Sequence, residues 1–457
     1  MTKLWRKADK EALNKMAIDH YIASVVPKDE MKKNGAWFLT KAEGNTITDI
    51  NGRQYLDGVG GGTLAMGIGY GREEIVKAMC EQAMQMHYIA PYSALTPVTA
   101  QLAAKLAEIT PGTLGATFFT GSGSESVEAA IKLAKQYHFY NKERKRYKFI
   151  SRQHAYHGTT MGALSLTGTG EVYDFLRFMS EPYLMPGVSH ITAPYCYRCD
   201  LGLEYPGCEV ACAQALKKEI EAQDPETVCA FIGEPVMGGG GCVPPVPEYW
   251  PMIRSICDQY GVLLIVDEVV CAFGRTGKMF GCEHWDLEPD IMAMAKNLTG
   301  CYFAMGATII KSELADKMPR FVHVHTFSGH PVGCAAGMAT IDIIEKEGLV
   351  DNAAEVGAYL LEGLQGLADH PIVGDVRGMG MLIGIELVQD KKTKARFPKK
   401  TMIAENVKTK ALDHGVFIRS GGGDVIELAP VLTITKKDAD TMVDAIDRSL
   451  TEVEQEV

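Results

Sequence analysis

Two continuous apolar runs, separated by a helical stretch, form the clearest pattern along the chain. Residues 228–234 (Val-Cys-Ala-Phe-Ile-Gly-Glu) and 262–267 (Val-Leu-Leu-Ile-Val-Asp) each predict a short buried strand. Between them, a helix is predicted to open at Pro247 and to end at Gly261, residue types that suit these two positions. Strands that are apolar on both faces and joined by a helix are typical of a parallel sheet covered on both sides. The pattern therefore predicts an α/β fold.

Weaker patterns flank this unit. The first 45 residues predict mainly helix, and residues 47–57 alternate around Asn51-Gly52, which is the strongest short signal for a β-hairpin. Toward the other end, the chain predicts a helix after Pro331, a strand over residues 380–387 and a final amphipathic helix from Lys436. These last elements indicate a second, smaller α+β unit.

Composition narrows the class of protein. The 457 residues correspond to about three domains of ~150 residues, and the formal charge of −11 makes nucleic acids and anionic membranes poor partners. No apolar run is long enough to cross a bilayer, and residues 1–7 are charged and lack the apolar stretch of an export signal. Without export, the twelve cysteines predict reduced thiols and a cytoplasmic location.

Three polar residues stand at predicted strand ends. Glu234 and Asp267 close the two buried runs, and Lys296 closes a third short run over residues 290–296. Ligands of parallel sheets bind outside the carboxyl ends of the strands. A buried lysine has a lowered pKa and can attack a carbonyl. The alternatives are that the two acids are structural carboxylates and that the lysine is an ordinary surface lysine. The position of all three residues at one edge of the predicted sheet favours a single site.

Residues 118–135 predict a strand end, a Gly/Ser turn and a helix. Ser122 and Glu125 have the spacing of a capping box, and the N–H groups of such a helix start can hold a phosphate. A capped helix that binds nothing is the alternative. Ser126 replaces the third glycine of the dinucleotide fingerprint, and no lysine follows at P-loop spacing, so the turn fits neither a dinucleotide nor ATP.

A phosphate cradle, a strand-end acid and a strand-end lysine are the three groups that pyridoxal 5′-phosphate needs. With these motifs, the chain resembles the class III (ω-amino) aminotransferases of the fold type I pyridoxal-phosphate enzymes, in the group of amine:pyruvate transaminases. The matching segments are Gly69-Tyr-Gly-Arg72, Thr120-Gly-Ser-Gly-Ser-Glu-Ser126, Tyr156-His-Gly158, Gly233-Glu-Pro235, Asp267-Glu-Val269, Phe273-Gly-Arg-Thr-Gly277, Ala295-Lys296 and Thr326-Phe-Ser-Gly-His-Pro331.

The resemblance implies a fold and an organisation. A large cofactor domain, with a mostly parallel sheet covered by helices, would span residues 66–330. Residues 1–65 and 331–457 would together form a small α+β domain. Two chains would build each site, so the protein would be a homodimer or a dimer of dimers.

The resemblance also implies roles for single residues. Lys296 would form the internal aldimine and move the proton during transfer, Asp267 would pair with the pyridinium nitrogen, and Glu234 would order the pocket. Tyr156 would stack on the ring, beside His157 and Val269. The phosphate would be held by Ser122, Gly123 and Ser124, and by Thr326 from the neighbouring subunit.

Two further residues would contact the substrate. Arg419, in Val416-Phe-Ile-Arg-Ser420, matches the mobile arginine that binds a substrate carboxylate, with an ordinary exposed arginine as the alternative. Leu64 stands where relatives often carry a tryptophan, which suggests an altered donor pocket. Gly67 and Asn297 also depart from the usual pattern, in which an asparagine and a glycine are found.

The implied activity is transfer of an amino group from a primary amine or ω-amino acid, of (S) preference, to pyruvate or 2-oxoglutarate in a ping-pong cycle. Taurine, β-alanine, 4-aminobutyrate, diamines and aryl-alkyl amines all remain open as donors. An aminomutase or decarboxylating transaminase of the same fold is the alternative within this family. A non-catalytic relative that binds a metal or a partner is the alternative outside it.

One cysteine cluster has no role in the implied transamination. Cys196, Cys199, Cys208 and Cys212 have a spacing that resembles tetrahedral zinc sites. A redox-sensitive pair, or a loop of plain thiols, would have the same spacing. A large aminotransferase needs no zinc for stability, so the prediction assigns no metal.

Overall fold

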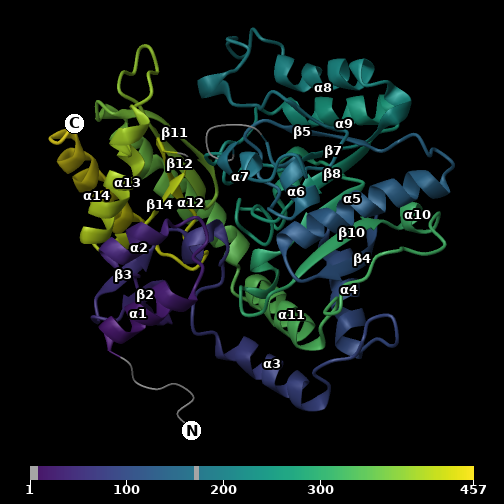
Figure 1. The fold of residues 1–457 in the computed structure, drawn as a ribbon, viewed down its shortest axis with the longest axis horizontal. Helices are drawn as coiled ribbons and strands as arrows, with labels where there is room; N and C mark the ends of the chain where they lie inside the picture. Colours follow the sequence, from purple (N-terminus) through teal and green to yellow (C-terminus); the bar gives the residue numbers. More distant parts are fainter. Residues whose placement is uncertain (1–8, 169–173, 422) are drawn as a thin grey trace.

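The structure, a computed structural model, describes residues 9–168, 174–421 and 423–457. The charged N-terminal segment that predicted no export signal lies outside these residues. A seven-stranded sheet forms the centre of the molecule (Figure 1). In spatial order its strands are β4 (Leu114–Thr120), β10 (Gly306–Lys311), β9 (Ile291–Met294), β8 (Leu263–Asp267), β7 (Val228–Gly233), β5 (Lys148–Arg152) and β6 (Val188–Ile191).

The sheet is mostly parallel, as predicted. Strand β10 is antiparallel to both of its neighbours, whereas β9, β8, β7, β5 and β6 pair in parallel. Because β4 and β9 both oppose β10, the carboxyl ends of β4 and of the parallel strands lie at the same edge. That edge carries the candidate site.

Helices cover both faces of this sheet. Phe231 and Leu264 point into one apolar core with α8 (Ala211–Ala222) and α9 (Tyr249–Tyr260). Their neighbours Ile232 and Ile265 point into a second core with α5 (Gly123–Tyr140). Adjacent strand residues face opposite sides of a sheet, which explains why both runs are apolar throughout.

The predicted βαβ unit is confirmed. Helix α9 begins two residues after Pro247 and ends at Gly261, whose φ of +61° favours glycine. Strands β7 and β8 pair in parallel, with Gly233 opposite Val266.

The two ends of the chain meet in a second sheet. Strands β1 (Leu39–Glu43), β2 (Thr46–Asp49) and β3 (Gln54–Asp57) form an antiparallel meander that contains the predicted hairpin, and β13 (Val416–Phe417) pairs with β3 in parallel. The N-terminal helices α1 (Lys10–His20) and α2 (Lys28–Asn34) precede it. Strand β1 differs from the prediction of helix; its side chains are largely exposed, so it lacks a periodic apolar signal.

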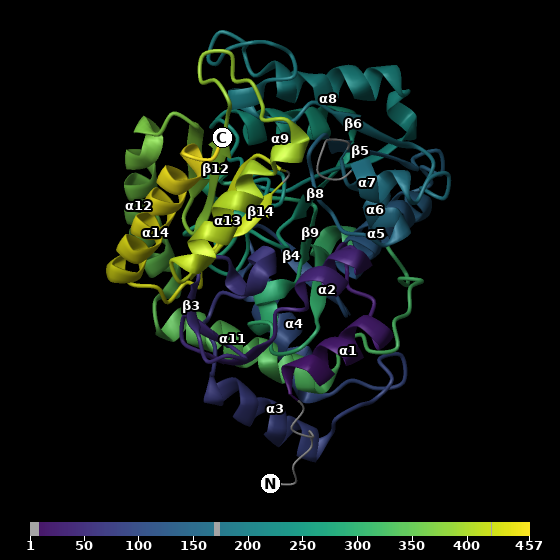
Figure 2. The ribbon, with the colours of Figure 1, turned by 60° about the vertical axis from the view of Figure 1, so that its left-hand side comes forward.

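A third sheet of four antiparallel strands completes the C-terminal part. Its order is β11 (Val373–Met379), β12 (Leu382–Leu387), β15 (Val425–Leu428) and β14 (Arg419–Gly421). Figure 2 shows α12 (Leu349–Gln365), α13 (Ile403–Asp413) and α14 (Lys436–Glu454) gathered at one side of the molecule. The domain boundaries at residues 65/66 and 330/331 stay a prediction.

The remaining helices complete the architecture. They are α3 (Glu73–Gln85), α4 (Pro97–Ile109), α6 (Met161–Leu166), α7 (Asp174–Phe178), α10 (Ser312–Ala315) and α11 (Pro331–Lys346). Among the described residues, no helix has both the length and the apolar character needed to cross a bilayer.

Candidate active site

The carboxyl ends of five strands surround one cavity of about 380 Å³, a volume in the usual range for small-molecule sites. Its lining brings together most of the residues predicted for the site: Ser122, Gly123, Ser124, Tyr156, His157, Glu234, Asp267, Val269 and Lys296. Residues from widely separated strands therefore meet at one edge of the sheet.

Asp267 is held in a fixed orientation at the end of β8. It is 3% exposed, and its Oδ2 lies 2.7 Å from Nδ1 of His157. Its Oδ1 accepts the backbone N–H of Val269 at 3.0 Å. A buried carboxylate needs such partners. His157 therefore contributes to the site by positioning Asp267.

Lys296 follows β9 and opens a short 3₁₀ turn (Lys296–Thr299). Its φ of +48° lies in the left-handed region, which is uncommon for a residue other than glycine and often marks a functional position. Its Nζ donates a hydrogen bond to the carbonyl of Thr63 at 2.9 Å. Burial, and then the charge of Arg419, lower the pKa of Lys296 to about 8. The amine is therefore far more available as a nucleophile at neutral pH than an exposed lysine.

Asn297 locks the backbone next to this lysine. Its Oδ1 accepts the N–H of Gly67 at 2.9 Å, and its Nδ2 donates to the carbonyl of Phe273 at 2.9 Å. A Cβ at Gly67 would lie 2.3 Å from Asn297 Nδ2. The two departures from the family pattern are thus in direct contact, which sequence reasoning missed because they are far apart in the chain.

The predicted phosphate cradle lies at the start of α5. Ser122 caps this helix, and its Oγ accepts the N–H of Glu125 at 3.3 Å. The carboxylate of Glu125 accepts the N–H of Gly121 at 2.6 Å rather than that of Ser122, so the predicted capping box is formed only in part. The start of this helix lines the cavity through Ser122, Gly123 and Ser124, and a helix N-terminus favours a phosphate.

Two glycines leave room for this cradle. A Cβ at Gly123 would lie 2.8 Å from Cγ1 of Val269, and a Cβ at Gly158 would lie 2.3 Å from Oγ of Ser124. Gly158 also has a φ of +118°. Side chains at these positions would close the space that a phosphate requires.

Glu234 lines the cavity at the end of β7. Its Oε1 accepts the N–H of Gly238 at 3.2 Å, and its Oε2 lies 3.5 Å from Arg152, which is itself fully buried. Burial raises the pKa of the Glu234 carboxyl above its ordinary value. These contacts hold the Glu234 carboxylate in place, and its role in ordering the pocket stays a prediction.

The other predicted residues have different positions. Burial raises the pKa of Tyr156, and the charge of Arg419 opposes that shift, so Arg419 acts on the cavity from β14. Leu64 is 2% exposed and packs in a small apolar cluster with Val59 and Val236. Thr326 lies exposed on the loop before α11, and neither it nor Leu64 lines the cavity of its own chain.

Comparisons with known proteins give the family. The profile of the class-III aminotransferases matches residues 28–450. The chain is a class-III aminotransferase. It is 37% identical to the taurine–pyruvate aminotransferase of Bilophila wadsworthia, covering 98% of both chains. It is 34% identical to the putrescine–pyruvate aminotransferase of Pseudomonas aeruginosa, covering 93% of this chain and 92% of that one.

A solved structure extends the likeness to the fold. An (S)-enantioselective omega-transaminase from Thermomicrobium roseum has a TM-score of 0.94 and 37% identity, covering 98% of this chain and 100% of the other. The fold is therefore that of the fold type I enzymes, and the aminotransferase depends on pyridoxal phosphate.

The cavity of the aminotransferase fits this cofactor. The N-terminus of α5 and the glycine-lined cradle suit the phosphate. The fixed carboxylate of Asp267 suits a protonated ring nitrogen, and the amine of Lys296 suits the aldehyde. Thr63 and Asn297 belong to the same site through Lys296, although no local motif marks them.

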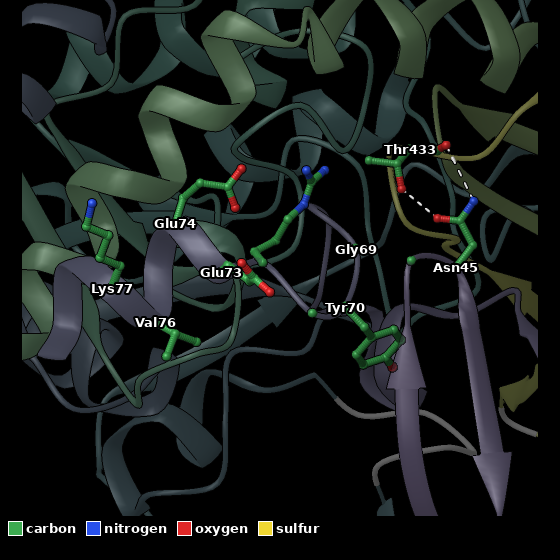
Figure 3. A pocket seen from close by; sticks show the side chains of 11 residues that line it. Asn45, Gly69, Tyr70, Glu73, Glu74, Val76, Lys77 and Thr433 are labelled. Atoms are coloured by element: carbon green, nitrogen blue, oxygen red, sulfur yellow. Dashed lines mark hydrogen bonds between the residues drawn. The ribbon is translucent and has the colours of Figure 1, made fainter.

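A second and larger cavity of the aminotransferase, of about 1220 Å³, lies beside the turn from Gly69 to Arg72. Figure 3 shows Asn45 and Thr433 pointing toward each other at its rim, where Thr433 donates to Oδ1 of Asn45 at 2.6 Å. Tyr70 donates to Asp57 at 2.8 Å. The polar groups of this larger cavity thus stabilise the packing of the two chain ends. The predicted catalytic groups line the smaller cavity instead.

The four clustered cysteines of the aminotransferase line a third cavity of about 20 Å³: Cys196, Cys199, Cys208 and Cys212. All four are free thiols. Burial, and then the neighbouring Cys208 and Cys199, raise the pKa of Cys196. Among the described residues, no three side chains are placed as ligands of a metal ion. The assignment of no metal stays a prediction.

Proposed function

We propose that this aminotransferase transfers the amino group of a primary amine or ω-amino acid to pyruvate, giving alanine. The observation that carries the proposal is the half-buried Lys296, with the pKa of its amine lowered to about 8, in one cavity with the fixed carboxylate of Asp267. Relatives named for pyruvate as acceptor support the choice of keto acid.

The chain's own groups divide the work. Pyridoxal phosphate, when bound, supplies the carbonyl that takes the amino group and the ring that takes up electrons. The amine of Lys296 removes and returns the proton at the substrate carbon that bears nitrogen. Asp267, oriented by His157, holds a proton at the ring nitrogen. Tyr156, which lines the cavity, would cover the ring and exclude water from it.

Binding residues complete the site. Ser122, Ser124 and the N–H groups of α5 hold the phosphate, and Thr326 does so from the neighbouring subunit of a homodimer. Arg419 binds the carboxylate of the keto acid, because a guanidinium matches a carboxylate in a bidentate arrangement. A cytoplasmic location and an (S) preference complete the proposal.

Replacement of Lys296 by alanine tests the proposal. The Lys296→Ala protein should keep its fold, form no alanine from pyruvate and amines, and lose the borohydride-reducible chromophore. Lys148→Ala is a matched control, because Lys148 belongs to β5 of the same sheet but does not line the cavity. Its side chain donates to the carbonyl of Gln223, which follows α8. It should retain activity within about twofold.

The products separate the alternatives. Alanine formed in equal amount to the consumed amine, without release of carbon dioxide, supports simple transamination. Carbon dioxide release, or an amine that is isomerised without pyruvate, contradicts it. Full activity of Lys296→Ala would overturn the mechanism.

A further inference from the structure

Arg419 has an ion-pair partner that no sequence motif predicted. Its Nη1 lies 3.1 Å from Oε2 of Glu427, and the Glu427 side chain is 0% exposed. The two residues are direct cross-strand partners in the antiparallel pair β14 and β15, so their side chains share one face of the sheet. The arginine predicted to bind the substrate carboxylate is thus placed on a strand and paired with a buried carboxylate.

Glu427 has no room to follow Arg419 if the arginine moves. A Cβ at Gly421 would lie 2.3 Å from Oε1 of Glu427, which shows that the carboxylate packs directly against the backbone of β14. The only residue type at position 421 that leaves space for this packing is glycine. The carboxylate therefore cannot approach the backbone of β14 any more closely.

Among the described residues, the two other cations that act on Glu427, Arg377 and Lys296, are engaged elsewhere. Arg377 also acts on Glu427, but its own N–H groups are bound to Asp375 and Glu386 at 2.8 Å each, and to the carbonyl of Gly241 at 2.9 Å. Lys296 acts on Glu427 more weakly still. Burial raises the pKa of Glu427 to about 6, and Arg419 is the strongest of the groups that oppose this shift.

We infer that Glu427 is a positioning residue that keeps Arg419 in the substrate pocket, so that this site selects amine donors with an anionic tail, a carboxylate or sulfonate, over donors with an apolar tail. The inference rests on the proposed function. An apolar donor requires the guanidinium to leave the pocket. The Glu427 carboxylate would then remain buried without its cation, which is strongly unfavourable. A donor with an anionic tail leaves the ion pair in place and is attracted by the positive charge of the guanidinium.

Donor specificity tests the inference. For Glu427→Gln, kcat/KM for an aryl-alkyl amine such as 1-phenylethylamine should rise at least tenfold, whereas kcat/KM for β-alanine should change less than threefold. A gain of this kind is not expected from structural damage. Asp424→Asn is the matched control, since it breaks the 3.3 Å pair with Arg396 near the same strand, and it should change neither value by more than about twofold. An unchanged value for the apolar amine in Glu427→Gln overturns the inference.

Thermal unfolding tests the same coupling without catalysis. In the cofactor-loaded protein, Arg419→Ala should lower Tm by roughly 5 °C or more, because it leaves Glu427 buried and unpaired. The double variant Arg419→Ala/Glu427→Gln should recover at least half of that loss. Additive losses would overturn the inference. If the wild-type protein transaminates no donor, the proposed function fails. The comparison of Tm between the single and double variants still decides whether Glu427 holds Arg419.

Discussion

Lys296 acquires its reactivity from its surroundings. An exposed lysine is protonated at neutral pH, but burial and the charge of Arg419 lower the pKa of Lys296 to about 8. The left-handed backbone at this residue costs about 1–2 kcal/mol. The two hydrogen bonds of Asn297 hold the next residue in place and thereby stabilise that conformation.

The lowered pKa predicts how cofactor capture depends on pH. In protein stripped of cofactor, the rate of recombination with pyridoxal phosphate should rise with pH and reach half of its maximum near pH 8, because only the deprotonated amine of Lys296 attacks a carbonyl. Absorbance after rapid mixing measures this rate. Arg419→Leu should move the midpoint to higher pH, since the positive charge of Arg419 favours loss of the proton. A midpoint near the ordinary value of lysine, about 10.4, would contradict the prediction.

At the scale of elements, the turn before α5 and the loop after β5 would form the proposed anion site together. Helix α5 supplies unpaired N–H groups and the positive end of its dipole. Gly158 brings the second segment close enough to contact Ser124. Thr159 N–H donates to Oγ of Ser124 at 3.2 Å. The cradle therefore depends on close packing between two segments, each of which is an ordinary turn by itself.

Gly158→Ala should disrupt this cradle. The added Cβ would meet Oγ of Ser124 at 2.3 Å, and we expect the dissociation constant of pyridoxal phosphate to rise at least tenfold, with a loss of about 1–3 kcal/mol in the free energy of unfolding. Gly202→Ala is the control. Gly202 also has a positive φ, +65°, but a Cβ there meets nothing within 4 Å. Equal cofactor affinity of the two variants would show that the clash has no role.

At the scale of the whole molecule, the described surface carries an apolar region close to Thr326. Tyr92, Leu95, Val324 and Phe327 are exposed. The first three of these residues line a cavity of about 310 Å³. Exposed apolar patches of this kind mark interaction sites. The same loop carries Thr326, so a second copy on this surface would receive Thr326 from its partner.

Mixed dimers test this arrangement. Lys296→Ala and Thr326→Ala subunits are each expected to be weakly active or inactive alone. A heterodimer of the two should regain one intact site, because in the proposed arrangement Lys296 and Thr326 of that site would come from different chains. Unfolding and refolding the two variants together should therefore restore activity, up to about one quarter of the wild-type value for random pairing. No recovery in mixed dimers would contradict a shared site.

Local patterns were sufficient for much of the architecture. The strands on either side of α9, the hairpin around Asn51-Gly52 and the polar residues at the strand ends were all predictable, because periodicity and turn chemistry act within about 15 residues. Strand β1 was missed because its exposed side chains leave no periodic signal.

Contacts between distant segments were not predictable in this way. Thr63 and Lys296 are 233 positions apart, and Gly67 and Asn297 are 230 apart. Glu427 stands close to Arg419 in sequence, but only the register of β14 and β15 makes the two residues partners. A single sequence contains no local pattern for such contacts.

The sequence by itself determined the α/β class and the sheet edge at which the proposed site residues meet, because these follow from short-range patterning and the carboxyl ends of parallel strands. The tertiary structure decided the depth at which Lys296 is buried, the partner that orients Asp267 and the carboxylate that holds Arg419. Those properties depend on desolvation and on distances between side chains, which exist only once remote segments pack together.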